Sequence, residues 1–117
     1  ASTQNLFSAD EQRFGIHAGQ SETAAMLHIA PHLVDGAQAQ DFASSSQARA
    51  QRYPILGDGK SAKLGWLMQD YNPHGAAGHA AAATAQQGQA LLQDASAKLV
   101  QLLQEISAIG LDEVLAP

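Results

Sequence analysis

A histidine among small residues, with a carboxylate shortly after it, is the pattern in this sequence best suited to chemistry. His17 lies in the run Ile16-His17-Ala18-Gly19, and Glu22 follows five residues after the histidine. Small residues let the backbone turn tightly and let a substrate approach. A carboxylate beside a histidine fixes the ring orientation and favours the protonated form, which suits general acid–base catalysis. From the residues alone, catalysis and a capping and packing role both remain open.

The other four histidines form two pairs that could be considered as metal ligands. His28 and His32 are four residues apart, which places two ligands on one face of a helix. Pro31 lies between them, however, and no glutamate is placed as a general base. His74 and His79 lie in a glycine-rich loop without adjacent carboxylates. We therefore expect ordinary histidines at both places and no metal ligands within this chain.

The segment after the candidate catalytic histidine predicts a short helix over residues 21–30. Ser21 or Thr23 would cap its N-terminus, and Glu22 suits the positive end of the helix dipole. Pro31 disfavours helical geometry at the residue before it, so the helix should end there.

A long amphipathic helix is predicted over residues 80–107. Its apolar side chains recur every three or four residues, which indicates one buried face. The members of that face are Leu91, Ala95, Leu99, Leu102 and Ile106. A short apolar run over residues 64–68 is bounded by polar residues and predicts a buried strand.

The composition limits both the core and the partners. The chain has 117 residues, of which 24 are alanine and only 29 are larger apolar residues. Such a core is thin, so we expect exposed apolar surface that needs the rest of a domain or other copies of the chain. Six Lys and Arg against eleven Asp and Glu give a net charge of −5. That balance argues against nucleic acid and against an anionic membrane surface as partners.

The absence of cysteine excludes disulfides, thiolate metal sites and cysteine nucleophiles. No apolar run approaches the roughly 20 residues that span a bilayer. The first residues have neither a basic start nor an apolar signal core. We therefore expect a cytoplasmic protein.

Two blocks of the sequence resemble the creatininase (creatinine amidohydrolase) family. The first block reads His-Ala-Gly-Gln-Ser-Glu-Thr over residues 17–23, Met-Leu over 26–27 and Pro-His-Leu-Val over 31–34. The family typically reads His-Ala-Gly-x-x-Glu-Thr-Ser-x-Met-Leu and then Pro-x-Leu-Val. The second block, Gly-Ala-Ala-Gly over 75–78 and Ala-Thr-Ala-Gln-Gln-Gly over 83–88, is similar to a glycine-rich block of the family. Order and spacing agree in both blocks.

The resemblance covers roughly residues 14–107, with two departures. Ala24 stands where the family usually has serine, and His79-Ala80 stands where it has Asp-Pro. Family members are longer, and their metal ligands lie in the N-terminal half. The resemblance therefore implies that residues 1–117 are the C-terminal portion of a creatininase-like α/β domain, a layered sheet with flanking helices.

The resemblance also implies roles for three residues. His17 matches the histidine taken to protonate the leaving amine, Glu22 the carboxylate that orients it, and Gly19 is expected to keep the loop close to the substrate. A divalent metal, zinc or manganese, is expected only with the missing N-terminal half. The implied partners are a small amide substrate, that half, and other subunits, because members often assemble as hexamers.

Two functions remain open at this stage. The chain could be part of a metal-dependent amidohydrolase that cleaves a C–N bond of a cyclic amide or related small molecule. Alternatively, it could be a non-catalytic interaction or assembly module that keeps the family scaffold without its metal centre. The substrate is not indicated by the sequence, and the isolated chain is expected to be inactive.

Overall fold

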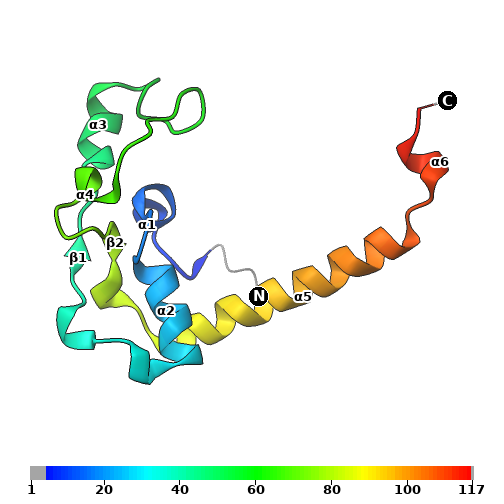
Figure 1. The fold of residues 1–117 in the computed structure, drawn as a ribbon, viewed down its shortest axis with the longest axis horizontal. Helices are drawn as coiled ribbons and strands as arrows, with labels where there is room; N and C mark the ends of the chain where they lie inside the picture. The colour runs from blue at the N-terminus through cyan, green and yellow to red at the C-terminus, as the bar shows by residue number, and fades with distance from the viewer. Residues whose placement is uncertain (1–4, 117) are drawn as a thin grey trace.

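The structure is a computed structural model that describes residues 5–116. Its fold is rich in helix (Figure 1). The α-helices are α1 (Ala9–Phe14), α2 (Gln20–Ile29), α3 (Ser46–Arg52), α4 (Met68–Tyr71), α5 (Ala85–Ala108) and α6 (Leu111–Val114). Short 3-10 helices include η2 (Pro31–Leu33), η3 (Gly36–Gln38) and η4 (Ala80–Ala82). Strands β1 (Asp41–Phe42) and β2 (Gly78–His79) pair antiparallel, with Asp41 opposite His79. None of the described helices is long and apolar enough to cross a bilayer.

The close contact between α2 and the first turns of α5 organises the body of the molecule. At Gly88 of α5, an added Cβ would lie 1.9 Å from the carbonyl oxygen of Ala24 in α2, so only glycine allows this approach. Ala24 itself is completely buried. The buried apolar residues of the described part are all alanines: Ala24, Ala76, Ala77 and Ala80. The core is therefore built from backbone proximity more than from large side chains.

The predicted helix over 21–30 is confirmed, with its ends shifted by one residue. Neither Ser21 nor Thr23 caps it, because the N-cap is Gly19, which has no side chain to accept a hydrogen bond. The helix ends before Pro31, where η2 begins. Pro31 therefore predicts the end of the helix correctly, whereas the predicted caps at Ser21 and Thr23 are wrong.

The predicted helix over 80–107 begins five residues later than expected. Thr84 caps α5, since its hydroxyl accepts from the Gln87 N–H at 3.1 Å and its own N–H donates to the Gln87 side chain at 3.0 Å. This reciprocal capping box fixes the start of the helix at Ala85. Residues 80–82 form η4 instead.

The predicted buried face of this helix is present only in its first half. Leu91 is half-buried, whereas Ala95 and the residues after it are exposed. Leu99 is 55% exposed and Ile106 is 58% exposed. Figure 1 shows the reason: α5 passes α2 and then extends away from the body of the molecule, with α6 at its far end.

The predicted strand over residues 64–68 is wrong. Leu64 to Leu67 have no regular secondary structure, and Met68 begins α4. Trp66 and Leu67 are more than half exposed. The Leu67 N–H donates to the Asp70 carboxylate at 3.1 Å, a bond that favours the start of a helix at this point. In the described residues the sheet consists of β1 and β2, so the expected layered sheet is not seen there.

Candidate functional site

His17 lies in an extended segment just before α2 and pairs with the segment around Ala77. The N–H groups of Ile16 and His17 donate to the Ala77 carbonyl at 2.8 and 3.3 Å, and the Ala77 N–H donates to the His17 carbonyl at 2.8 Å. This pairing joins the two sequence blocks that carry the family resemblance. The backbone of His17 is thus fixed by residues sixty positions further along the chain.

The backbone turns sharply at Ala18, where φ is +52°. This left-handed conformation costs a residue with a side chain about 1 kcal/mol. The carboxylate of Glu22 accepts a hydrogen bond from the Ala18 N–H. The hydroxyl of Thr23 lies 3.5 Å from the Ala18 carbonyl. The first turn of α2 therefore holds the turn that presents His17.

Glu22 also faces the histidine ring. Its Oε2 lies 3.7 Å from Nδ1 of His17, and the two side chains are 58% and 57% exposed. An exposed pair at this distance contributes little to folding stability. The carboxylate therefore lies on the Nδ1 side of an exposed imidazole.

Gly19 is buried between the turn and β2. An added Cβ would lie 2.5 Å from Oε1 of Glu11 and 3.0 Å from the Cα of Gly78. The packing of these segments therefore requires glycine at this position. Its role toward a substrate stays a prediction.

Glu11 is the residue of this site that the sequence did not indicate. Its Oε1 accepts from the Gln20 N–H at 2.6 Å, and its Oε2 accepts from the His79 N–H at 2.8 Å. It thus replaces the side-chain cap that Gly19 lacks and joins α2 to β2. Because Gly19 has no side-chain acceptor, the acceptor comes from another element, and only the structure identifies Gly19 as the N-cap.

A further hydrogen bond joins the start of α2 to the start of α5. The buried side chain of Gln20 donates to the Ala82 carbonyl at 3.1 Å and lies 3.4 Å from Oε1 of Gln87. Gln87 is also part of the cap of α5. These hydrogen bonds therefore connect the start of α2 with η4 and with the start of α5.

The other histidines do not form a cluster. His28 and His32 are exposed at the end of α2 and in η2. His74 packs its ring against Phe42, with centroids 5.6 Å apart, and His79 is exposed beside Glu11. Across residues 5–116, no group of three or more His, Cys, Asp or Glu could hold a metal ion. The described residues therefore do not fit the zinc or manganese site that the resemblance implies.

The sequence and the fold are similar to those of one family of known proteins. Residues 1–103 match the family model described as creatininase, creatinine amidohydrolase. A crystal structure described as a putative creatinine amidohydrolase from Bacteroides fragilis is 27% identical and superposes with a TM-score of 0.69. That match covers 95% of this chain and 41% of the other, so the chain spans about two fifths of the length of that relative. No curated protein gives a significant match. The family match extends over both sequence blocks that meet at Ala77, and the chain belongs to the creatininase family.

Proposed function

We propose that this chain forms part of an amidohydrolase that cleaves a C–N bond of a cyclic amide or a related small molecule. Membership of the creatininase family supports this class of reaction. The observation that carries the assignment of residues is the pairing of His17 with Glu22 on a turn held at Ala18. The imidazole is exposed and its backbone is fixed, which suits a group that must meet a substrate.

The chemistry assigned to His17 is proton donation. Hydrolysis of an amide requires a proton on the departing nitrogen, because an amide anion is a poor leaving group. With Glu22 on the Nδ1 side, Nε2 of His17 carries the proton that the leaving amine receives. Glu22, whose carboxylate lies 3.7 Å from Nδ1, is proposed to orient the ring. Gly19 is proposed to keep this loop close to the substrate.

The creatininase family generally uses a divalent metal. In this proposal zinc or manganese is held by residues outside the described part, since the described residues do not fit such a site. The proton-transfer role proposed for His17 and Glu22 is supported by the 3.7 Å distance between their side chains and does not depend on where that metal is held.

A second candidate function is an assembly module without catalysis. The observation that favours it is the exposed apolar face on the second half of α5. Its exposed members are Leu99, Val100, Leu102, Leu103 and Ile106. Such a face is typical of a surface that another part of the protein, or another copy, covers. We propose association into a homo-oligomer, which is compatible with either function.

The test is steady-state kinetics on the complete, metal-loaded protein with creatinine and a panel of small cyclic amides. We expect His17→Ala to lower kcat by about 10²–10⁴-fold, because a general acid contributes that much. Glu22→Gln should lose less, and the double mutant should lose less than the product of the two. The matched control is His28→Ala, which removes an exposed histidine from the other end of α2.

Two outcomes would decide against the catalytic assignment. Near-normal turnover in His17→Ala would make His17 an ordinary loop histidine. An equal loss in His28→Ala would show that the effect is not specific to the candidate site. Absence of hydrolysis across the whole panel, with self-association present, would favour the assembly module.

A further inference from the structure

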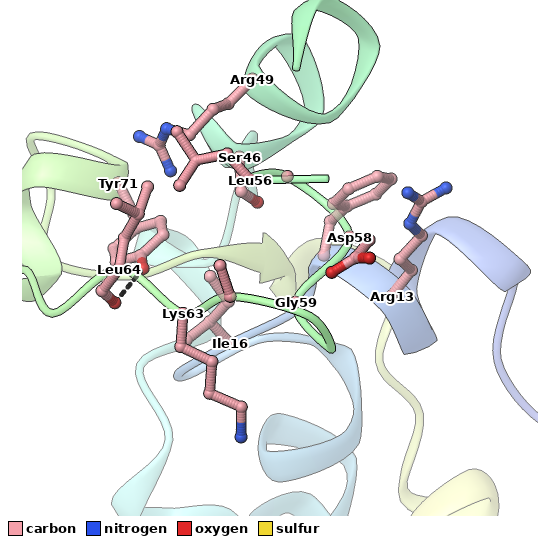
Figure 2. A pocket seen from close by; sticks show the side chains of 13 residues that line it. Arg13, Ile16, Ser46, Arg49, Leu56, Asp58, Gly59, Lys63, Leu64 and Tyr71 are labelled. Atoms are coloured by element: carbon pink, nitrogen blue, oxygen red, sulfur yellow. Dashed lines mark hydrogen bonds between the residues drawn. The ribbon is translucent and has the colours of Figure 1, made fainter. Parts of the chain in front are cut away.

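A pocket of about 410 Å³ lies between α1, α3, α4 and the loop that precedes α4 (Figure 2). Ile16 lines it, whereas His17 and Glu22 do not. The pocket is therefore separate from the candidate catalytic pair, and an argument about it does not depend on the proposed hydrolase.

Positive charge is concentrated at this pocket in a chain that is negative overall. Arg13, Arg49 and Lys63 line it, which is half of the six Lys and Arg of the sequence. Figure 2 shows them at separate places around the rim. Asp58 is the one carboxylate among the lining residues, so positive charge is in excess by two.

The carboxylate of Asp58 accepts hydrogen bonds from residues of its own loop. Its Oδ1 accepts from the N–H groups of Lys60 and Ser61 at 2.7 and 2.8 Å, and its Oδ2 accepts from the Ser61 hydroxyl at 2.7 Å. These bonds, that of the Ser61 hydroxyl first, hold the pKa of Asp58 below its ordinary value. Asp58 therefore stabilises the loop wall and leaves the cations on the rim available.

The interior of the pocket is apolar. Its lining includes Phe14, Ile16, Leu56, Leu64 and Tyr71. The Tyr71 hydroxyl lies 3.5 Å from the Leu64 carbonyl, a contact drawn in Figure 2 that joins the loop to α4. An apolar surface and charged donors thus occur in one cavity.

Two of the cations lie over aromatic rings. The Arg49 guanidinium is 5.6 Å from the centre of the Tyr71 ring, and that of Arg13 is 4.9 Å from the centre of the Phe14 ring. Stacking of this kind holds a guanidinium in place while its N–H edge remains able to donate. Arg49 also donates to the Ser45 hydroxyl at 3.3 Å.

We propose that this pocket binds a small organic anion, a carboxylate attached to an apolar or aromatic body. One of the rim cations would bind the carboxylate, and the apolar residues would contact the body. An inorganic anion would leave the apolar lining unused, and a neutral amide would leave the cations without a partner.

The test is isothermal titration calorimetry on the complete protein at low ionic strength. The probes are 3-phenylpropionate, its neutral analogue 3-phenylpropionamide, and inorganic phosphate. We expect the carboxylate to bind at least about tenfold more tightly than either of the others, and to weaken as salt screens the rim. Equal affinity for the acid and the amide, preference for phosphate, or no binding of the acid would each overturn the proposal.

Variants then locate the binding. Arg49→Gln should weaken the carboxylate by about fivefold or more. The matched control is Arg52→Gln, because Arg52 lies on the same helix, stacks on Tyr53 at 5.3 Å and does not line the pocket. Lys63→Gln is the second variant, since Lys63 is exposed on the loop and its loss should leave α3 unchanged. Equal loss in the Arg52 variant, or no loss in both pocket variants, would contradict the assignment.

Discussion

The two halves of α5 have the same apolar periodicity but different surroundings. In the first half, Gly88 is buried against Ala24 of α2, and Leu91 is half-buried. In the second half, Leu99 and Ile106 are more than half exposed. The difference shows that apolar spacing predicts a helix, while a single small residue decides where another helix can approach it.

The largest loss of stability should come from a substitution at the contact between Gly88 of α5 and Ala24 of α2. Gly88→Ala places a Cβ 1.9 Å from the Ala24 carbonyl oxygen, which is backbone and cannot rotate away. We expect the free energy of unfolding to fall by about 3 kcal/mol, measured by urea denaturation. Helix propensity alone would give a gain of about 1 kcal/mol, so the sign of the change is decisive.

Gly36→Ala is the control for that variant. An added Cβ at Gly36 meets no atom within 4 Å, so stability should change by less than about 0.5 kcal/mol. A stabilised Gly88→Ala protein would mean that α2 and α5 are not in this close contact.

A smaller loss is expected at the carboxylate that joins α2 to β2. Glu11→Gln keeps one acceptor oxygen but turns an amide N–H toward one of the two donors, Gln20 N–H or His79 N–H. We expect a loss of about 2 kcal/mol, together with faster hydrogen exchange at the amides of Gln20 and His79.

Asp10→Asn is the matched control, since Asp10 is the exposed neighbouring carboxylate on α1. Its effect should stay within about 0.5 kcal/mol. If both substitutions had the same effect, the loss would reflect the charge of α1 and not the two hydrogen bonds.

The smallest change in stability is expected on the outer half of α5. Leu99→Gln removes an exposed leucine and should alter the free energy of unfolding by less than about 0.5 kcal/mol, while weakening self-association in sedimentation experiments. Leu91→Gln, at a half-buried position of the same helix, should cost about 1–2 kcal/mol. Equal losses at both positions would show that the outer half is also covered in solution.

The sequence predicted the two main helices because their signals are local. Glu22 in the first turn and Pro31 after the last turn were enough for α2, and the body of α5 follows from its repeat. The strand over 64–68 failed because an apolar run does not specify a pairing partner, and the bond from Leu67 to Asp70 favours a helix instead. The start of α5 is specified by Thr84 and Gln87, which form a capping box, and the prediction of a start at residue 80 did not include this pair.

The candidate site was only half predictable. His17 and Glu22 are close in sequence, and the structure brings them together. Glu11 could not be found in this way, because its bond to His79 joins residues 68 positions apart. Its local bond to Gln20 becomes meaningful only once Gly19 is known to be the N-cap.

The long reach of these contacts has a consequence for synthesis on the ribosome. The backbone of His17 forms hydrogen bonds with Ala77, and the Glu11 carboxylate accepts a hydrogen bond from His79. Before residues 77–79 have been synthesised, the His17 segment lacks its pairing with Ala77, and Glu11 lacks its hydrogen bond from His79. The loop that carries His17 therefore reaches its final geometry only after the glycine-rich segment has emerged, when α5 can dock onto α2.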